Sequence, residues 1–508
     1  MAQREAAMKQ RHGAVRARRG PVAVMAIAIG LITAACSVGQ ASDEVTTTTM
    51  LAAAANSTTT ATSAAETTSK QAALPETPAC PDFEADWPQS GRDLDYTSHN
   101  PSETAIAPAS VASLRPAWRH DDNGGVSGTP VIVDGLVFYG DWTGVVHAAD
   151  ACTGELVWST SVGEAPLATS LAVATGLVVA SDFADGIHAL SQADGAIVWS
   201  TALAGGGTAT GSGAPAIANG MVITGVAGGV EPVGWRGSIV AFDLASGEEL
   251  WRAYTDNDLP TEGGSVSVWS SPAVDLGRGV AYIGTGNTNR IRNDGEPVPD
   301  SPFANALLAI DIDTGEVIWV TRMLEEDAGR DFDIGAPPTL FTADGRDLVA
   351  VGGKSGDFFA LDRDSGEEVW RINLTAGSRA GGVMKGAAYT DGVLYVASNA
   401  GFLSDGVIFA IDATDGTELW SFSGRAPLIG HNLSIANGVV FVTWYGGEVM
   451  ALDGGTGREL WAESLGVRLQ GGVSISDGYV FVGFGGGAPP DLQPSSVGGV
   501  AAFAVPSN

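Results

Sequence analysis

The sequence predicts an all-β fold, an eight-bladed β-propeller whose blades are four-stranded antiparallel sheets. The first reason is a unit that recurs from residue 81 onward: a strand ending in Ala-x-Asp, a turn containing Gly, and a second strand ending in Trp. The second is its period, because the repeat tryptophans follow one another at intervals of 40 to 68 residues. The third is the count of 69 glycines, which suits many tight turns between short strands.

The copies of this unit are distinct in the sequence. Six are complete, at residues 144–158, 237–251, 305–319, 356–370, 406–420 and 447–461, and a degenerate copy at 186–199 has Ser191 near the place of the Asp. Alternating segments between them, such as 129–139 and 392–397, predict the other strands and their hairpins. One blade cannot bury both of its faces, so blades stack around an axis, and we expect each Trp to pack on a neighbouring blade.

The two ends of the repeat region predict how the ring closes. The last strand, at 498–503, starts like a repeat but has no Trp after it. Trp118, the first repeat tryptophan, has no repeat strand before it. We therefore expect the N-terminal segment to supply the missing strand of the last blade, which favours eight blades over the alternative of seven.

Residues 1–35 predict a lipoprotein signal peptide. A basic stretch ending in Arg18-Arg19 precedes an apolar run, and small residues then lead into Cys36. The run has about 15 residues, whereas a spanning helix needs about 20, so we favour a lipid on Cys36 over an uncleaved anchor. A twin-arginine export signal at Arg18-Arg19 stays open. We expect an exported protein of the cell envelope, lipid-anchored to a membrane.

Two further segments follow the signal peptide. Residues 36–84 are rich in Ala, Ser and Thr and predict a flexible tether, because they cannot bury enough apolar area to offset the entropy of ordering. Residues 85–508 form the predicted propeller. With lipid on Cys36, Cys80 and Cys152 remain in an oxidising compartment, and we predict a disulfide between them. The net charge of −32 argues against nucleic acid as a partner.

The repeat A-x-D-x-x-[TS]-G-E-x-x-W resembles the tryptophan-docking repeat of the pyrroloquinoline quinone (PQQ) dehydrogenases, the quinoproteins. Residues 87–118 and 126–154 also resemble this family, and the second segment looks closest to polyvinyl-alcohol dehydrogenases. The resemblance covers nearly all of residues 85–504. It implies PQQ and Ca²⁺ as cofactors and oxidation of an alcohol, with polymeric and secondary alcohols as candidate substrates. The chain lacks Cys-x-x-Cys-His for a covalent haem, so electrons would pass to an external acceptor.

Three residues match the family's quinone floor and its Ca²⁺ ligands. Trp269 matches the Trp on which the quinone stacks, and it is not a repeat tryptophan, although a core role stays open. Asn287 follows 18 residues later at the family's spacing and matches a Ca²⁺ ligand, whereas alone it would be read as a turn residue. Glu231 matches a second Ca²⁺ ligand, with an exposed loop acid as an equal alternative.

Two more matches concern proton transfer and the quinone edge. Asp331 aligns with the family's catalytic Asp, with Asp333 as the alternative, and the resemblance assigns it the role of general base. Lys354 matches the basic residue that contacts the quinone carbonyl edge, and a solvated turn lysine is its plain alternative.

The chain departs from the family in ways that favour a second function. It has no adjacent cysteine pair, and it has Val126-Ser127-Gly128 where the alcohol dehydrogenases keep a Glu that contacts the cofactor. Some propeller relatives are scaffolds, such as the lipoprotein of the outer-membrane barrel-assembly machinery. The alternative to an enzyme is therefore a non-catalytic propeller lipoprotein that acts as a binding or assembly platform.

Overall fold

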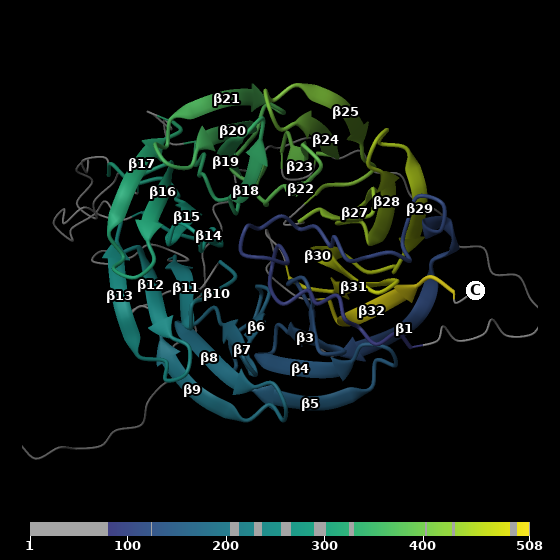
Figure 1. The fold of residues 1–508 in the computed structure, drawn as a ribbon. Coiled ribbons are helices and arrows are strands. Elements are labelled where there is room, and N and C mark those ends of the chain that lie inside the picture. The colour runs from purple at the N-terminus through teal and green to yellow at the C-terminus, as the bar shows by residue number, and fades with distance from the viewer. Residues whose placement is uncertain are drawn as a thin grey trace, which may run out of the picture. The chain divides into compact units, whose positions relative to one another are not determined.

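The computed structural model describes residues 80–506, except 123, 204–212, 228–235, 256–265, 289–300, 325–329, 402–403, 429–431 and 488–494. The predicted signal peptide, Cys36, most of the predicted tether and Glu231 lie outside the described residues. One compact unit spans Ala73–Asn508. Its described residues form eight four-stranded antiparallel sheets arranged around a ring, which confirms the predicted eight-bladed propeller (Figure 1).

Seven blades are built from four consecutive strands, with the innermost strand first. Three of them contain β2 (Val131–Val133), β3 (Leu136–Gly140), β4 (Val145–Asp150), β5 (Leu156–Ser161); β6 (Ala172–Ala174), β7 (Leu177–Ser181), β8 (Gly186–Ser191), β9 (Ile197–Ala202); β10 (Ala216–Ala218), β11 (Met221–Val226), β12 (Ser238–Asp243) and β13 (Glu249–Tyr254). Two contain β14 (Ala273–Asp275), β15 (Val280–Gly284), β16 (Ala306–Asp311), β17 (Val317–Arg322); β18 (Thr339–Ala343), β19 (Arg346–Gly352), β20 (Asp357–Asp362) and β21 (Glu368–Asn373). The last two contain β22 (Ala388–Thr390), β23 (Val393–Asn399), β24 (Gly406–Asp412), β25 (Glu418–Ser423); β26 (Ser434–Ala436), β27 (Val439–Trp444), β28 (Glu448–Asp453) and β29 (Glu459–Ser464).

The eighth blade, here called the closing blade, joins the two ends of the chain. It contains β30 (Leu469–Ser476), β31 (Tyr479–Phe484), β32 (Gly498–Ala504) and, on the outside, β1 (Arg115–Asp122), which follows the 3-10 turn η1 (Val111–Ser113). β1 pairs with β32 in antiparallel register, so the N-terminal segment supplies the outer strand, as predicted. The inner strands of neighbouring blades contact each other all the way round, from β2 to β30 and back to β2.

The repeat tryptophans dock each blade onto the next. The indole of Trp118 packs on Gly154, where a Cβ would lie 2.6 Å from the ring, and its N–H donates to the Ala151 carbonyl at 2.9 Å. Gly154 also has φ of +73°, so a side chain there would be strained as well as crowded. The same indole-to-carbonyl bond joins blades at Trp158, Trp199, Trp251, Trp319, Trp370 and Trp420.

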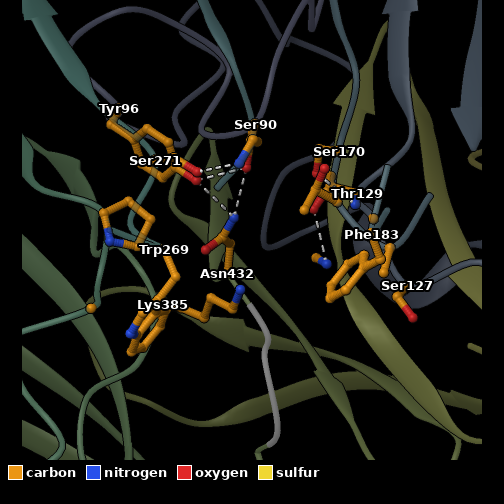
Figure 2. A pocket seen from close by; sticks show the side chains of 17 residues that line it. Ser90, Tyr96, Ser127, Thr129, Ser170, Phe183, Trp269, Ser271, Lys385 and Asn432 are labelled. Atoms are coloured by element: carbon orange, nitrogen blue, oxygen red, sulfur yellow. Dashed lines mark hydrogen bonds between the residues drawn. The ribbon is translucent and has the colours of Figure 1, made fainter. Parts of the chain in front are cut away.

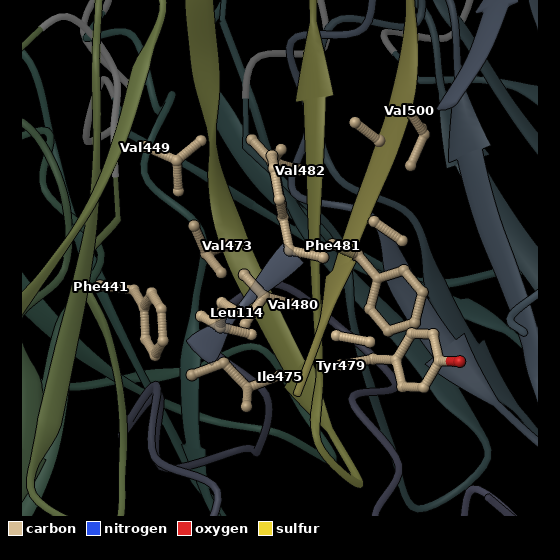
Figure 3. Packing of buried hydrophobic residues seen from close by; sticks show 14 of the residues in the cluster. Leu114, Phe441, Val449, Val473, Ile475, Tyr479, Val480, Phe481, Val482 and Val500 are labelled. Carbon is tan, nitrogen blue, oxygen red and sulfur yellow. The ribbon is translucent and has the colours of Figure 1, made fainter. Parts of the chain in front are cut away.

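Apolar side chains fill the space between blades. Around the closing blade, Phe481 and Val480 of β31 pack in one buried cluster with Phe441 of β27 and Leu114 (Figure 3). Phe83 belongs to the same cluster, with its ring 5.2 Å from that of Tyr479. Burial of these side chains is the main stabilising contribution to the ring.

A disulfide bond also attaches the start of the described chain to the first blade. Cys80 is bonded to Cys152, with 5.5 Å between their Cα atoms. Cys152 lies in the turn between β4 and β5. Together with buried Phe83, this bond means that chain packing begins before residue 85, inside the segment expected to be tether.

Residues 87–100, here called the lead-in segment, cross one end of the propeller axis. Their main chain hydrogen-bonds to the inner strands of six blades, through Ile132, Val173, Val274, Leu340, Tyr389 and Ile435. The segment appears in purple across the centre of Figure 1. It therefore covers that end of the axis. In the described ranges, no helix has the length and apolar character needed to cross a bilayer.

Candidate functional site

Four of the predicted site residues lie together at the inner ends of two neighbouring blades. Trp269 precedes β14 and Asn287 follows β15, so both belong to one blade. Asp331 lies on the segment that leads into β18, and Lys354 follows β19 of that next blade. Main-chain bonds join the two blades here, because the Ile334 N–H donates to the carbonyl of Thr285 at 3.0 Å.

Asp333 is the residue that connects the cluster. One carboxylate oxygen accepts the main-chain N–H of Asn287 at 2.9 Å. The other accepts the indole N–H of Trp269 at 3.1 Å and the ammonium of Lys354 at 2.6 Å. Its side chain is 6% exposed, so these bonds replace water around a buried charge. Asp333 therefore orients the aromatic ring and the cation.

Asp331 is held differently, although it lies two residues away. Its carboxylate is 3.3 Å from the Lys354 ammonium and 3.8 Å from the guanidinium of Arg379, and its side chain is 31% exposed. Burial, and then the nearby charge of Asp333, raise the pKa of Asp331 above its ordinary value, while Lys354 partly opposes this. Its backbone is left-handed, with φ of +62°, which Asp tolerates better than most residues. Asp331 is thus the carboxyl group of the pair suited to exchange a proton.

The indole of Trp269 is fixed on two further sides. Gly335 lies so close that a Cβ there would be 1.8 Å from Cζ2 of the ring. The ammonium of Lys354 is 5.4 Å from the ring centroid, within the range of a cation–π contact. The ring is therefore held in place by its N–H bond, the glycine and the lysine.

A cavity of about 190 Å³ adjoins Trp269 on the propeller axis (Figure 2). Trp269 and Gly335 form part of its wall, and Ser90 and Tyr96 of the lead-in segment form another part. Lys385, which precedes β22, also lines it. Most of the other lining residues are small, and five of them carry hydroxyl groups, so the cavity is polar.

The resemblance left some of this site unpredicted. Asp333 was considered only as an alternative base, whereas the structure makes it the residue that holds Trp269 and Lys354. Lys385 was not predicted, although the sequence has only four lysines. Of the two in the described residues, Lys385 lines the axial cavity and Lys354 lies beside Trp269. The small number of lysines in the sequence is a signal that could have identified Lys385 as a candidate site residue. Glu231 lies outside the described residues.

The arrangement combines four chemical groups within one small region. It has an aromatic face, a proton-accepting carboxyl, a fixed cation and oxygen atoms of amide and carboxylate type. The described residues contain no group of three or more His, Cys, Asp or Glu side chains placed to hold a metal ion. A metal ion here would therefore need oxygen donors beyond the described acidic side chains.

Two family models match parts of the chain. The model described as glucose/ethanol/alcohol dehydrogenase, beta-propeller domain, matches residues 205–389. The model described as outer membrane protein assembly factor BamB matches residues 106–296. The first match contains Asp331, Lys354 and Lys385, and the two overlap at Trp269 and Asn287.

The chain is also similar to individual alcohol dehydrogenases. A polyvinylalcohol dehydrogenase of Sphingopyxis sp. (strain 113P3) is 27% identical, over 75% of this chain and 61% of its own length. A quinohemoprotein alcohol dehydrogenase of Comamonas testosteroni is 28% identical, over 59% of this chain and 48% of its own. The chain thus spans less than two thirds of either relative. These matches confirm the resemblance to the quinoprotein β-propellers.

Solved structures confirm the fold. The crystal structure of quinohemoprotein alcohol dehydrogenase from Comamonas testosteroni superposes with a TM-score of 0.72 at 23% identity, covering 84% of this chain and 81% of that chain. The crystal structure of BamB from Moraxella catarrhalis gives 0.54 at 16% identity, covering 77% and 99%.

Proposed function

We propose that this protein, a relative of the quinoprotein β-propellers, is a PQQ-dependent alcohol dehydrogenase. The observation that carries the proposal is the convergence of Trp269, Asn287, Asp331 and Lys354 at the inner ends of two blades. These residues are up to 85 positions apart in the chain, and none belongs to the blade repeat. A scaffold needs no such cluster, whereas a redox site built on a planar cofactor needs each of its parts.

The residues present fit a flat, anionic quinone. Trp269 offers an aromatic face whose orientation is fixed by Asp333 and Gly335. Lys354 places a cation beside that face and would contact a carbonyl at the edge of the ring system. When bound, the quinone with its Ca²⁺ would supply the hydride acceptor and a Lewis acid. The propeller would supply the binding surface and the charges around it.

Asp331 would act on the substrate as a general base. A proton acceptor works best when its pKa is shifted toward the operating pH, and the pKa of Asp331 is raised. Its partial exposure leaves it accessible to an alcohol hydroxyl. Asp333 has no such freedom, because three donors already occupy its oxygens. We therefore assign Asp331 as the base and Asp333 as a positioning residue.

Ca²⁺ would bind beside this pair. It takes six to eight oxygen ligands, from carboxylates, amides, carbonyls and water. Asn287, whose main chain contacts Asp333, is the described candidate ligand, and Glu231 is the candidate from outside the described residues. Because the described acidic side chains form no metal-holding cluster, the other ligands would come from amides, carbonyls and water.

The remaining parts of the proposal concern substrate, acceptor and location. Similarity to polyvinylalcohol dehydrogenases favours a secondary or polymeric alcohol. Electrons would leave to an external acceptor. Export with a lipid on Cys36 would place the enzyme on a membrane, and mass spectrometry of the mature protein tests this: a chain beginning at Met1, or cleaved beyond Cys36, would contradict it.

Reconstitution tests the activity. Purified protein is mixed with PQQ and CaCl₂, and bound quinone is measured by its absorbance after gel filtration. Reduction of an artificial acceptor is then followed with a panel of alcohols that includes polyvinyl alcohol. We expect bound quinone and turnover with at least one alcohol. If neither is found, the scaffold alternative, which the BamB family match favours, replaces the enzyme.

A further inference from the structure

The axial cavity beside Trp269 contains a charge that the proposed reaction does not use. Lys385 lines the cavity, and Figure 2 shows its amino group directed into it beside Asn432. Among the described residues, Lys385 has no hydrogen-bond or ion-pair partner. Burial lowers the pKa of Lys385, which reflects the cost of keeping an unpaired ammonium away from water.

Nothing in the described cavity wall compensates this charge. Its residues come from the lead-in segment and from all eight blades, and none of them is Asp or Glu. Tyr96 cannot supply a negative charge, because burial raises the pKa of its phenol. Lys354 differs in this respect, since it is paired with two carboxylates.

Hydrogen-bonded polar side chains form part of the cavity wall, so the cavity suits a polar ligand. The hydroxyls of Ser90 and Tyr96 are 2.6 Å apart, and both accept from the amide nitrogen of Asn432, at 3.2 and 3.4 Å. The Asn432 carbonyl oxygen is buried without a partner among the described residues. Lys385 is half-buried and faces this polar cavity without a partner among the described residues. An ammonium in that position needs an anion or ordered water.

We propose that this cavity is a carboxylate-binding site in which Lys385 provides the counter-charge. An ammonium inside a protein is stabilised strongly by a paired anion, because the local dielectric is low. The volume of about 190 Å³ is smaller than the usual pocket for a drug-sized ligand. It accommodates a compact carboxylate beside the hydroxyl groups of the wall. The carboxylate could be free in solution or belong to a quinone stacked on Trp269.

A fluorinated probe tests the site without any cofactor. Binding of difluoroacetate to the purified protein is followed by ¹⁹F NMR at constant ionic strength. We expect saturable binding that Lys385→Met weakens about tenfold or more, since a bond to a charged group is lost. The matched control is Arg425→Met, which removes an exposed cation of the outer surface and should leave binding unchanged.

The melting temperature distinguishes a packing role of Lys385 from a binding role. If Lys385 served only packing, Lys385→Met would lower the melting temperature. We expect the melting temperature without anion to be unchanged or higher, because a half-buried charge that lacks a partner among the described residues is removed. Absence of difluoroacetate binding by the wild type, or equal binding by Lys385→Met, overturns the proposal.

Addition of PQQ identifies the source of the carboxylate. Displacement of difluoroacetate would assign the site to a carboxylate of the cofactor. Retention by the PQQ-loaded protein would assign it to a separate small acid. If the protein binds difluoroacetate through Lys385 but does not bind PQQ, the proposed enzymatic function fails while the carboxylate site stands.

Discussion

The ion pair between Lys354 and Asp333 should contribute to stability as well as to the site, and Lys354→Met tests this. The substitution keeps the length of the side chain and removes its charge. Asp333 would remain 6% exposed, with N–H donors from Trp269 and Asn287 but without the ammonium at 2.6 Å. Its charge would then be incompletely paired in a buried position.

The size of the effect follows from burial. Removing one partner of a buried ion pair destabilises a protein by about 3 to 5 kcal/mol. We expect about 3 kcal/mol, because two donors to Asp333 remain. Arg425→Met is the matched control, since Arg425 pairs with Glu459 at the same 2.6 Å but its side chain is 61% exposed. An exposed pair of this kind contributes under about 1 kcal/mol.

Equilibrium urea denaturation followed by circular dichroism measures both variants, and Asp333→Asn completes a double-mutant cycle. The carboxamide removes the charge that Lys354 neutralises, so the double variant should be less destabilised than the sum of the single variants. We expect a coupling of about 2 kcal/mol or more. The reasoning is refuted if Lys354→Met is no more destabilising than Arg425→Met, or if the two changes are additive within about 0.5 kcal/mol.

Other predictions follow from the same contacts. Asp331→Asn should abolish acceptor reduction while the absorbance of bound quinone persists. Turnover by the wild type should rise with pH as Asp331 loses its proton. Turnover that does not change from about pH 4 to 7 would contradict the role of Asp331 as general base. Gly335→Ala should weaken quinone binding about tenfold by displacing Trp269. The control Gly163→Ala, whose new Cβ would have no neighbour closer than 4.0 Å, should leave quinone binding unchanged. Equal quinone affinities of the two variants would argue that the contact between Gly335 and Trp269 does not position the ring. Cys80→Ser should lower the free energy of unfolding by about 4 kcal/mol on the chain-entropy model, since the bond closes a loop of 72 residues; reactive thiols at both positions in unreduced protein would contradict the bond.

The fold could be predicted because its information is local and repeated. The Ala-x-Asp strand, the Gly turn and the terminal Trp recur within about 15 residues, and each does in the structure what its chemistry indicates. Closure could be predicted too, since Trp118 and the strand at 498–503 each lack the partner that the other provides. The end of the tether could not, because burial of Phe83 depends on Tyr479, which no local pattern connects to it.

The site was only partly predictable, because its decisive contacts join different blades. Order along the chain identified Trp269, Asn287, Asp331 and Lys354 through resemblance. The different roles that we propose for Asp331 and Asp333 depend on which carboxylate accepts the Lys354 ammonium at 2.6 Å. The sequence alone does not show that distance. Lys385 becomes a candidate only because no described residue that lines its cavity is an acid, and this property arises when the ring is assembled.

The way the ring closes also determines when during synthesis it can close. β32 lies between β31 and β1, so the last strand to be made is an interior strand of its sheet and not an edge. Ala85 donates to Asp477 across 392 positions, and the lead-in segment needs inner strands from most of the chain. A growing chain can form the consecutive blades as they emerge, but β1 has to wait for β32. Only a polypeptide translated through residue 504 can close the ring, so premature termination would leave a nearly complete propeller with β1 unpaired and open to proteases.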